Sequence, residues 1–331
     1  MTRFPDSIGV AVIGCGLIGR KRVAALPPGC RVVALADSDR ARAEALAATL
    51  PYPARVGASA SEVLGGGDVG LAIVATIHAA LAPITLEALS AGCDVLVEKP
   101  GARCAAEAAD LVAAASAAGH QVRVGFNHRF HPALLRAHEL VGDGGHGKLL
   151  SVRARYGHGG RPGYEREWRA ERALSGGGEL VDQGMHLIDL TRFLVGDVDL
   201  VFSEVRTDFW PMEVEDNAYL ALRPRAGGFA WLHASWTEWK NLFSLEVALE
   251  RAKIEVSGLG GSYGTERLAL YEMLPEMGPP RTTIWEWPQA DRSWELETAD
   301  VLATLGGSAS LGADVQDCLA AWTVVEEAYR R

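Results

Sequence analysis

Three ionisable side chains recur within one apolar stretch near the middle of the chain: Asp182, His186 and Asp189. At about 100° per residue of an α-helix they fall within about 60° of one another, and apolar residues occupy the rest of the circumference. Burying an ionisable group costs free energy unless it is paired, so we expect Asp182 and His186 to meet each other beside a polar cavity. An imidazole held by a carboxylate suits proton acceptance near neutral pH; the alternative is a structural pair.

A lysine follows a short apolar run in the sequence Glu98-Lys99-Pro100. The run predicts a parallel strand, and open α/β sheets bind their ligands at the carboxyl ends of such strands. Apolar neighbours could lower the pKa of Lys99 into a range useful for proton transfer. The alternative is a lysine that extends to solvent and pairs with Glu98.

A glycine motif, Gly14-Cys15-Gly16-Leu17-Ile18-Gly19, lies between the first predicted strand and the first predicted helix. It allows a tight turn, close approach of a pyrophosphate and tight helix packing, and the helix N-terminus supplies N–H donors. Asp37 ends the next strand, where it would bind a ribose 2′-hydroxyl and repel a 2′-phosphate, which favours NAD over NADP. Arg40 and Arg42 lie close to Asp37, so NADP stays an alternative cofactor. The motif itself has a second interpretation, a glycine turn with a helix-capping Asp.

The first 126 residues alternate short β-branched runs with alanine-rich helical stretches. The predicted strands are 8–13, 31–36, 71–75, 94–97 and 122–126. The predicted helices are 17–26, 40–50, 79–91 and 104–118. This alternation predicts a doubly wound α/β domain over residues 1–126, with a parallel sheet covered on both faces.

Residues 127–331 have a different texture, with longer amphipathic strand candidates at 148–157, 198–208, 217–223, 228–238 and 243–257. Helices are expected from Pro132 and over 178–194 and 311–330. Together they predict an α+β domain with helices on one sheet face. A second subunit would cover the other face, so we expect a homo-oligomer.

Several segments of this second region allow two interpretations. The tryptophan-rich segment 231–241 predicts sheet core and subunit contact, with aromatic faces for a sugar as the alternative. The glycine-rich loops 158–164 and 258–264 could close over a substrate or form solvent-facing turns. His128, His131 and His138 lack a convincing set of further metal ligands, so we expect no metal site.

Composition narrows the class of protein. The 331 residues are 48% hydrophobic and 22% charged, which indicates a globular protein of two domains. The net charge of −10 argues against nucleic-acid binding. Five scattered cysteines and the absence of a basic–apolar leader predict a cytoplasmic protein with reduced thiols. Residues 69–86 lack charge, but His78 and Pro83 interrupt them, which argues against a membrane segment.

The glycine motif, Glu98-Lys99-Pro100 and the segment from Gly176 to Asp189 together resemble the Gfo/Idh/MocA oxidoreductases, and Asn127-His128-Arg129-Phe130 resembles the entry into their second domain. The resemblance implies a Rossmann domain and a large open, mostly antiparallel sheet that mediates dimers or tetramers. It implies that His186 takes a hydroxyl proton as a hydride passes to nicotinamide C4. Lys99 would bind that hydroxyl and Asp182 would orient the imidazole. The peptide before Pro100 is often cis in relatives.

The resemblance also implies the residues that bind ligands. Those expected to contact NAD are Gly14, Gly16, Leu17, Ile18, Gly19, Asp37, Thr76, Glu98, Lys99 and Asn127. Those expected to contact the substrate are Lys99, Arg129, Tyr156, Trp168, Arg169, Asp182 and His186. The chain departs from the family at Leu81, where many members carry His, and at His138, where many carry Lys.

The implied activity is NAD-dependent oxidation of a secondary hydroxyl of a sugar, cyclitol or glycoside to a ketone; nucleotide sugars and aminoglycosides fall within this class. Two alternatives stay open. One is a redox-neutral member that keeps NAD bound during epimerisation or glycosidic cleavage. The other is a nucleotide-sensing regulator, which the presence of Lys99, Asp182 and His186 argues against.

Overall fold

The computed structural model describes residues 8–331, which form two compact units. The first unit contains the chain up to Asn127 together with Trp294–Ala320. The second contains His128–Ser293 and Ala321–Arg331. The sequence predicted one boundary after residue 126, and the first unit also includes the later segment Trp294–Ala320.

The returning segment is part of the first unit's core and sheet. Val301 and Leu305, on α9 (Ser293–Leu305), pack in the same hydrophobic core as Val10, Val12 and Leu35. The segment then adds a short strand, β15 (Ala313–Asp314), antiparallel to β6 (Val122–Gly125). These contacts join residues distant in sequence, so composition along the chain did not reveal them.

The first unit is built on a seven-stranded sheet in the order β15-β6-β5-β4-β1-β2-β3, parallel except for β15. The remaining strands are β1 (Ile8–Ile13), β2 (Cys30–Ala36), β3 (Arg55–Gly57), β4 (Leu71–Val74) and β5 (Asp94–Glu98). β4 and β5 are buried along their whole length, as strands covered on both faces must be. The strand order reverses beside β1, which is where such sheets bind ligands.

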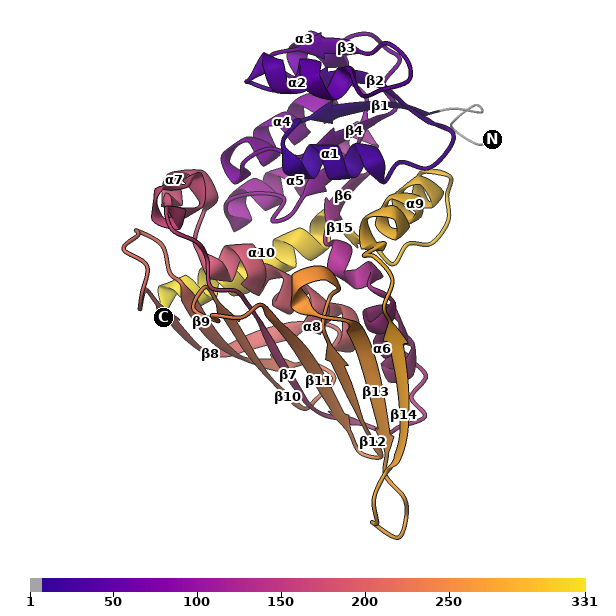
Figure 1. Ribbon diagram of the computed structural model, residues 1–331, viewed down its shortest axis with the longest axis vertical. Helices are drawn as coiled ribbons and strands as arrows, with labels where there is room; N and C mark the ends of the chain where they lie inside the picture. The colour runs from indigo at the N-terminus through magenta and orange to yellow at the C-terminus, as the bar shows by residue number, and fades with distance from the viewer. Residues whose placement is uncertain (1–7) are drawn as a thin grey trace. The chain divides into compact units, whose positions relative to one another are not determined.

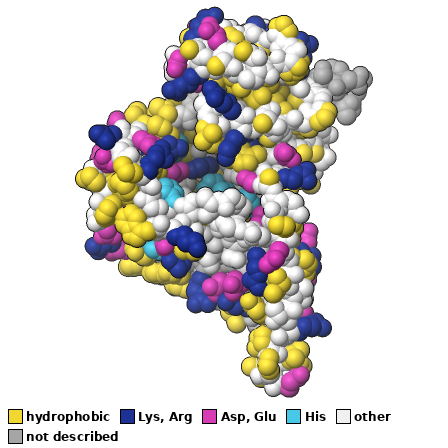
Figure 2. Space-filling model, viewed as in Figure 1, with side chains coloured by type: hydrophobic (Ala, Val, Ile, Leu, Met, Phe, Trp, Pro, Cys, Tyr) yellow, Lys and Arg dark blue, Asp and Glu magenta, His cyan; other side chains and the backbone are white. Residues whose placement is uncertain are grey.

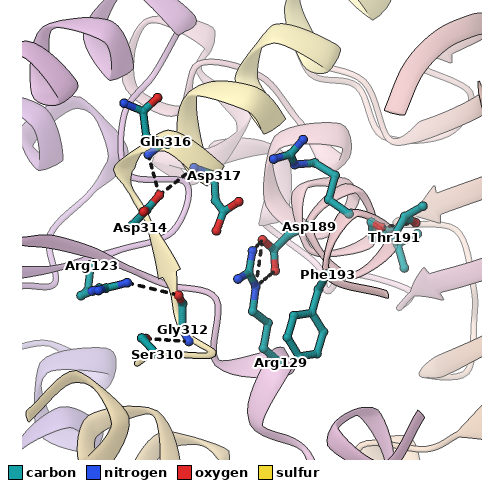
Figure 3. Close-up of polar contacts among 12 residues, drawn as sticks. Arg123, Arg129, Asp189, Thr191, Phe193, Ser310, Gly312, Asp314, Gln316 and Asp317 are labelled. Atoms are coloured by element: carbon teal, nitrogen blue, oxygen red, sulfur yellow. Dashed lines mark hydrogen bonds and ion pairs between the residues drawn. The ribbon is translucent and has the colours of Figure 1, made fainter. Parts of the chain in front are cut away.

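Helices flank both faces of this sheet (Figure 1). They are α1 (Leu17–Ala24), α2 (Arg40–Ala47), α3 (Ser61–Leu64), α4 (His78–Ser90), α5 (Ala105–Ala118) and α9. α10 (Val315–Arg330) starts in this unit, where the Asp314 carboxylate accepts the backbone N–H groups of Gln316 and Asp317 (Figure 3). The doubly wound fold predicted for this region is confirmed.

The second unit is built on an eight-stranded sheet in the order β14-β13-β12-β11-β7-β10-β9-β8. Its strands are β7 (Leu149–Gly157), β8 (Val198–Arg206), β9 (Asn217–Pro224), β10 (Phe229–Ser235), β11 (Leu242–Leu249), β12 (Ala252–Ser257), β13 (Glu266–Glu272) and β14 (Arg281–Trp287). Only the β7–β10 pair is parallel. The mostly antiparallel sheet is confirmed, but the predicted strand 243–257 is a hairpin that turns at Glu250 and Arg251.

One face of this sheet carries helices and the other does not (Figure 1). α6 (Pro132–Gly142) and α8 (Met185–Val195) pack on the covered face. Burial alternates along β11 and β12, as expected for a sheet with one covered face. The open face exposes the large apolar side chains of Phe202, Phe229, Trp231 and Ile284, which are 38–50% exposed. Within residues 8–331, no helix has the length and apolarity needed to cross a membrane.

Candidate active site

The three glycines of the turn after β1 have two different roles: Gly14 and Gly19 allow close packing, and Gly16 leaves space. Gly14 has φ +95°, and a Cβ there would lie 2.4 Å from the carbonyl oxygen of Ala75. A Cβ on Gly19 would lie 1.9 Å from the carbonyl oxygen of Gly14. Both are therefore required by the protein's own packing. A Cβ on Gly16 would meet nothing within 4 Å, so this residue leaves open space at the N-terminus of α1, which fits the close approach of a phosphate.

Asp37 is held in place by the turn that it faces. Its Oδ2 accepts the backbone N–H of Cys15 at 2.8 Å, and its Oδ1 accepts that of Asp39 at 2.9 Å. Arg40 pairs with Glu44 and Arg42 pairs with Asp39, so both arginines already face carboxylates. A fixed carboxylate at this position fits ribose hydroxyls and disfavours an added phosphate.

The other expected cofactor contacts of this unit lie at the carboxyl ends of its strands. Leu17, the first residue of α1, is 72% exposed, and Ile18 is half-buried. Thr76 follows β4, whose last residue pairs in register with the end of β1. Asn127 is buried just beyond β6. The parallel register thus brings these residues to the sheet edge that carries Gly16.

Lys99 follows β5, and the Lys99–Pro100 peptide is cis. Glu98 is buried and its Oε1 accepts Nε of Arg22 at 2.5 Å. Arg22, itself fully buried, also donates through Nη1 to Oε2 of Glu297 at 2.6 Å. Glu98 is therefore bound through Arg22 to α1 and α9, and its expected contact with NAD stays a prediction.

In the second unit, a glycine turn precedes the helical segment with the predicted catalytic residues. A Cβ on Gly177 would lie 1.9 Å from the hydroxyl of Tyr329, and one on Gly178 would lie 2.0 Å from the carbonyl oxygen of Glu215. The Glu215 carboxylate accepts the N–H groups of Gly178 and Leu180 and the hydroxyl of Tyr329. Burial raises the pKa of Glu215. These contacts fix where the helical segment begins.

The helical segment is not the regular α-helix expected over 178–194. Leu180–Gly184 form a π-helical segment, η4, and α8 follows from Met185. The 100° step therefore fails between Asp182 and His186, because hydrogen bonds in a π-helix span five residues. Such segments are frequent at functional sites.

Asp189, the third member of the predicted stripe, belongs to a different contact. Arg129 Nε lies 2.9 Å from its Oδ2 and Nη2 lies 2.5 Å from its Oδ1, and both side chains are buried (Figure 3). The guanidinium also stands 5.2 Å from the ring centroid of Phe193. Arg129, expected to contact the substrate, thus forms a structural pair that ties the start of this unit to α8.

His186 lies in a cluster of rings that the sequence did not reveal. Its imidazole stacks on that of His128, with centroids 3.8 Å apart and an interplanar angle of 25°. His128 Nε2 lies 3.1 Å from the hydroxyl of Tyr156. Burial, and then Tyr263 and the charge of Asp182, raise the pKa of Tyr156 above its ordinary value. The phenol therefore keeps its proton near neutral pH, and the direction of its hydrogen bond with His128 is set by the tautomer of that imidazole.

Two other residues expected to contact the substrate, Arg169 and Trp168, lie near Asp182. Its Oδ2 lies 3.5 Å from Nε of Arg169, whose guanidinium carbon stands 4.5 Å from the ring centroid of Trp168. Tyr164 is close enough that the charge of Asp182 adds to burial in raising its pKa. The predicted contact between Asp182 and His186 stays a prediction.

Two further residues of the cluster escaped the sequence analysis. Tyr263 lies beside Tyr156, with centroids 5.4 Å apart, and accepts the side-chain amide of Gln183 at 3.3 Å. Tyr263 belongs to the glycine-rich loop 258–264, so composition marked the loop but not the residue. Gln183 lies within the conspicuous motif, where its chemistry gave no signal.

The other histidines of this unit have structural partners. His131 Nδ1 lies 3.0 Å from Oε2 of Glu266, and the same carboxylate accepts the N–H of Ala133 at the start of α6. His138 Nδ1 lies 2.9 Å from the carbonyl oxygen of Phe193. Over residues 8–331, no three His, Cys, Asp or Glu side chains are grouped as a metal site would require.

Family models match both units of the chain. The model described as an oxidoreductase family with an NAD-binding Rossmann fold matches residues 8–126. The model of a GFO/IDH/MocA C-terminal domain matches residues 134–263. The chain belongs to the Gfo/Idh/MocA oxidoreductase family.

Curated relatives within this family are distant. Levoglucosan dehydrogenase of Pseudarthrobacter phenanthrenivorans is 30% identical over 147 residues, 44% of this chain and 38% of that protein. Inositol 2-dehydrogenase 2 of Saccharopolyspora erythraea is 30% identical over 194 residues, 57% of this chain and 54% of that protein. 1,5-anhydro-D-fructose reductase of Ensifer adhaerens is 30% identical over 235 residues, 68% of each chain. The chain thus spans about half the length of the first two.

Solved structures of other Gfo/Idh/MocA-like proteins share the two-domain fold. An oxidoreductase domain protein from Kribbella flavida superposes with a TM-score of 0.86 at 25% identity, covering 98% of this chain and 97% of that one. GenD2 from gentamicin A biosynthesis, in complex with NAD, gives a TM-score of 0.82 at 26% identity, with coverages of 98% and 94%. The fold class expected from the sequence is confirmed.

Proposed function

We propose that the protein is an NAD-dependent oxidoreductase that converts a secondary hydroxyl of a sugar, cyclitol or glycoside into a ketone. The observation that carries the proposal is the pairing of open space at Gly16 with a carboxylate fixed at Asp37. The names of the relatives, which refer to levoglucosan, inositol and anhydrofructose, support the substrate class.

The first unit would bind the cofactor through its strand ends. The N–H groups at the start of α1 would hold the pyrophosphate beside Gly16, and Asp37 would accept a ribose hydroxyl. Leu17, Ile18, Thr76 and Asn127 would line the same edge of the sheet. The bound NAD supplies a hydride acceptor at nicotinamide C4.

Residues of the second unit would accept the proton of the substrate hydroxyl. We infer that His186 accepts the proton of the substrate hydroxyl while Asp182 orients the imidazole, and that Lys99 donates a hydrogen bond to the same oxygen. We also infer that the Tyr156 hydroxyl, 3.1 Å from Nε2 of His128, donates to that nitrogen and so favours a neutral His128. A neutral ring stacked on His186 adds no like charge when His186 becomes imidazolium, so the contact supports a base in this position.

Substrate contacts are proposed around Asp182 and Tyr156. Arg169 offers several N–H donors for sugar hydroxyls, and the adjacent Trp168 offers an apolar face. Arg129 is left out of this set because its guanidinium binds Asp189.

We further propose that the protein is a cytoplasmic homo-oligomer that pairs through the open face of the eight-stranded sheet. That face exposes Phe202 and Trp231, whose rings stack with centroids 6.3 Å apart, and such patches commonly mark subunit interfaces. All five cysteines are free thiols, in keeping with a reducing compartment.

The activity is tested by absorbance at 340 nm with NAD and a panel of free sugars, inositols, nucleotide sugars and aminoglycosides. NADH formation that His186→Ala slows by roughly 10²–10⁴ is the expected result. Denatured protein that releases NAD, without net NADH formation on any substrate, would instead identify the redox-neutral alternative. A protein that neither binds NAD nor reduces it would contradict the proposal.

A further inference from the structure

Two large aromatic side chains stand exposed beside each other in the second unit. Phe209, on the β8–β9 connection, is 56% exposed, and Trp239, on the β10–β11 connection, is 67% exposed. Their rings meet edge to face, with centroids 4.8 Å apart. Figure 2 shows hydrophobic side chains gathered on this side of the unit, over α7 (Arg172–Ser175) and the β8–β9 connection.

A buried carboxylate fixes the loop that presents Phe209. Asp216 is fully buried and accepts the backbone N–H groups of Asp208, Phe209 and Trp210, each at 2.8 Å. The indole of Trp210 donates to the carbonyl oxygen of Trp236 at 3.1 Å. A loop held in this way keeps its aromatic surface preorganised, which reduces the entropy lost when a ligand binds.

Packed rings link the exposed aromatic pair to the residues proposed to bind substrate. Ring contacts run from Phe209 to Trp210 at 5.3 Å and from Trp210 to Tyr164 at 6.1 Å. Tyr164 lies within the electrostatic reach of Asp182 and Arg169. The buried ring of Tyr164 thus lies between the exposed aromatic pair and the charges of Asp182 and Arg169 within the second unit.

Polar groups flank the aromatic rings. Arg161 stands over the ring of Tyr164, 5.4 Å from its centroid, and its Nη2 lies 2.5 Å from Oε1 of Glu167. Aromatic faces with charged hydrogen-bonding groups at their edge suit a pyranose ring, which has an apolar C–H face and a rim of hydroxyls. By contrast, two side chains that bury about 150–250 Å² each fall short of the roughly 800 Å² per partner of a stable protein interface.

We propose that Phe209 and Trp239 form a second carbohydrate subsite, which stacks on the outer ring of a two-ring glycoside while the inner ring lies at Asp182 and His186. This inference rests on the proposed function and narrows its substrate class to glycosides with at least two rings. The aromatic pair would act on binding of the outer ring alone, because it lies apart from the proposed proton-accepting group.

The test uses matched probes and the full-length protein with NAD present. The pairs are methyl α-D-glucopyranoside with maltose, methyl β-D-glucopyranoside with cellobiose, and myo-inositol with galactinol. Calorimetry should show that the two-ring member of at least one pair binds roughly 3- to 10-fold more tightly. Trp239→Ala and Phe209→Ala should remove that gain without changing the Kd of the one-ring member, and Trp239→Phe should keep most of it.

A matched control is Trp231→Ala, which removes an exposed tryptophan from the middle of the open sheet face and should leave the gain intact. Equal affinities within every pair, no binding of any probe, or a gain that survives Trp239→Ala would each overturn the subsite. A change of oligomeric state in Trp239→Ala would also overturn it, in favour of a contact between copies of the chain. NADH formation from one-ring substrates by Trp239→Ala reports separately on the proposed function.

Discussion

The imidazole rings of His186 and His128 lie nearly parallel with centroids 3.8 Å apart, although the two residues are far apart in sequence. Two imidazolium rings at this distance would repel each other, so the pair can hold one proton easily and two only with difficulty. With the Tyr156 hydroxyl as the inferred donor to Nε2, His128 stays neutral. On that inference, His186 is the ring of the pair that accepts a proton.

His186→Ala should lower kcat by roughly 10²–10⁴, the usual effect of losing a positioned general base. The Kd for NAD should stay near the wild-type value, since the glycine turn belongs to the other unit. Stopped-flow turnover and NAD titration check both values. Near-normal turnover at neutral pH would show that the ring stack is only structural, and Lys99 would then become the leading candidate for the base.

Tyr156→Phe should move the acidic limb of the kcat/KM profile to higher pH. The variant frees Nε2 of His128 to take a proton, and a cationic His128 opposes proton uptake by His186. Activity should therefore fall most below about pH 6.5, where a histidine is protonated, and stay near wild type at pH 8–9. A uniform loss at all pH values would indicate a role in substrate binding instead. The Kd for NAD serves as the control.

Gly16→Ala should weaken NAD binding, whereas Gly19→Ala should lower the stability of the fold. Gly16 has φ −71° and open space around its Cβ position, so the alanine variant should melt like wild type but bind NAD roughly tenfold or more weakly. A Cβ on Gly19 would overlap the backbone of Gly14, so that variant should lose about 1–3 kcal/mol of stability. Thermal melts with and without NAD separate the two effects. Equal NAD affinity in Gly16→Ala and wild type would contradict the proposed phosphate position.

Asp37→Ser should narrow the preference for NAD over NADP by roughly tenfold, because it removes the negative charge that opposes a 2′-phosphate. Titration of both cofactors into wild type and variant measures the ratio. Arg40→Ala is the matched control, since Arg40 pairs with Glu44 on the exposed side of α2. Tighter binding of NADP than of NAD by the wild type would contradict the role given to Asp37.

Trp231→Asp should shift the protein towards the monomer of 35.3 kDa. The substitution places a charge in the apolar open face, where a partner copy would have to desolvate it. Light scattering at micromolar concentration measures the change. A wild-type protein that scatters as a stable monomer would exclude the proposed interface.

Local patterns accounted for most of the fold. The buried runs of β4 and β5 and the glycine turn at Gly14 are properties of neighbouring residues, so the parallel sheet and its edge could be predicted. Short elements escaped: β15 has two residues and depends on its pairing with β6. The sequence of 243–257 predicts one strand and not the hairpin, because two charged residues, Glu250 and Arg251, are a weak turn signal.

Only those residues of the candidate site that belong to sequence motifs could be predicted. Lys99, Asp182 and His186 stood out because ionisable groups in apolar segments are conspicuous. The ring of His128 and the pairing of Arg129 with Asp189 depend on how η1 (Asn127–Phe130) packs against α8, which no local pattern encodes. The π-helical turn at Leu180 also escaped, because its backbone is set by tertiary contacts such as those of Glu215.

The return of the chain to the first unit limits how that unit can be moved between proteins. Residues up to Asn127 alone would lack β15 and α9, leave Val301 and Leu305 missing from the core, and deprive Arg22 of Glu297. A chimera that exchanges this module must therefore carry two separate stretches of sequence. Recombination at one junction would separate Glu98, and with it Lys99, from the helix that completes the charge network beneath it.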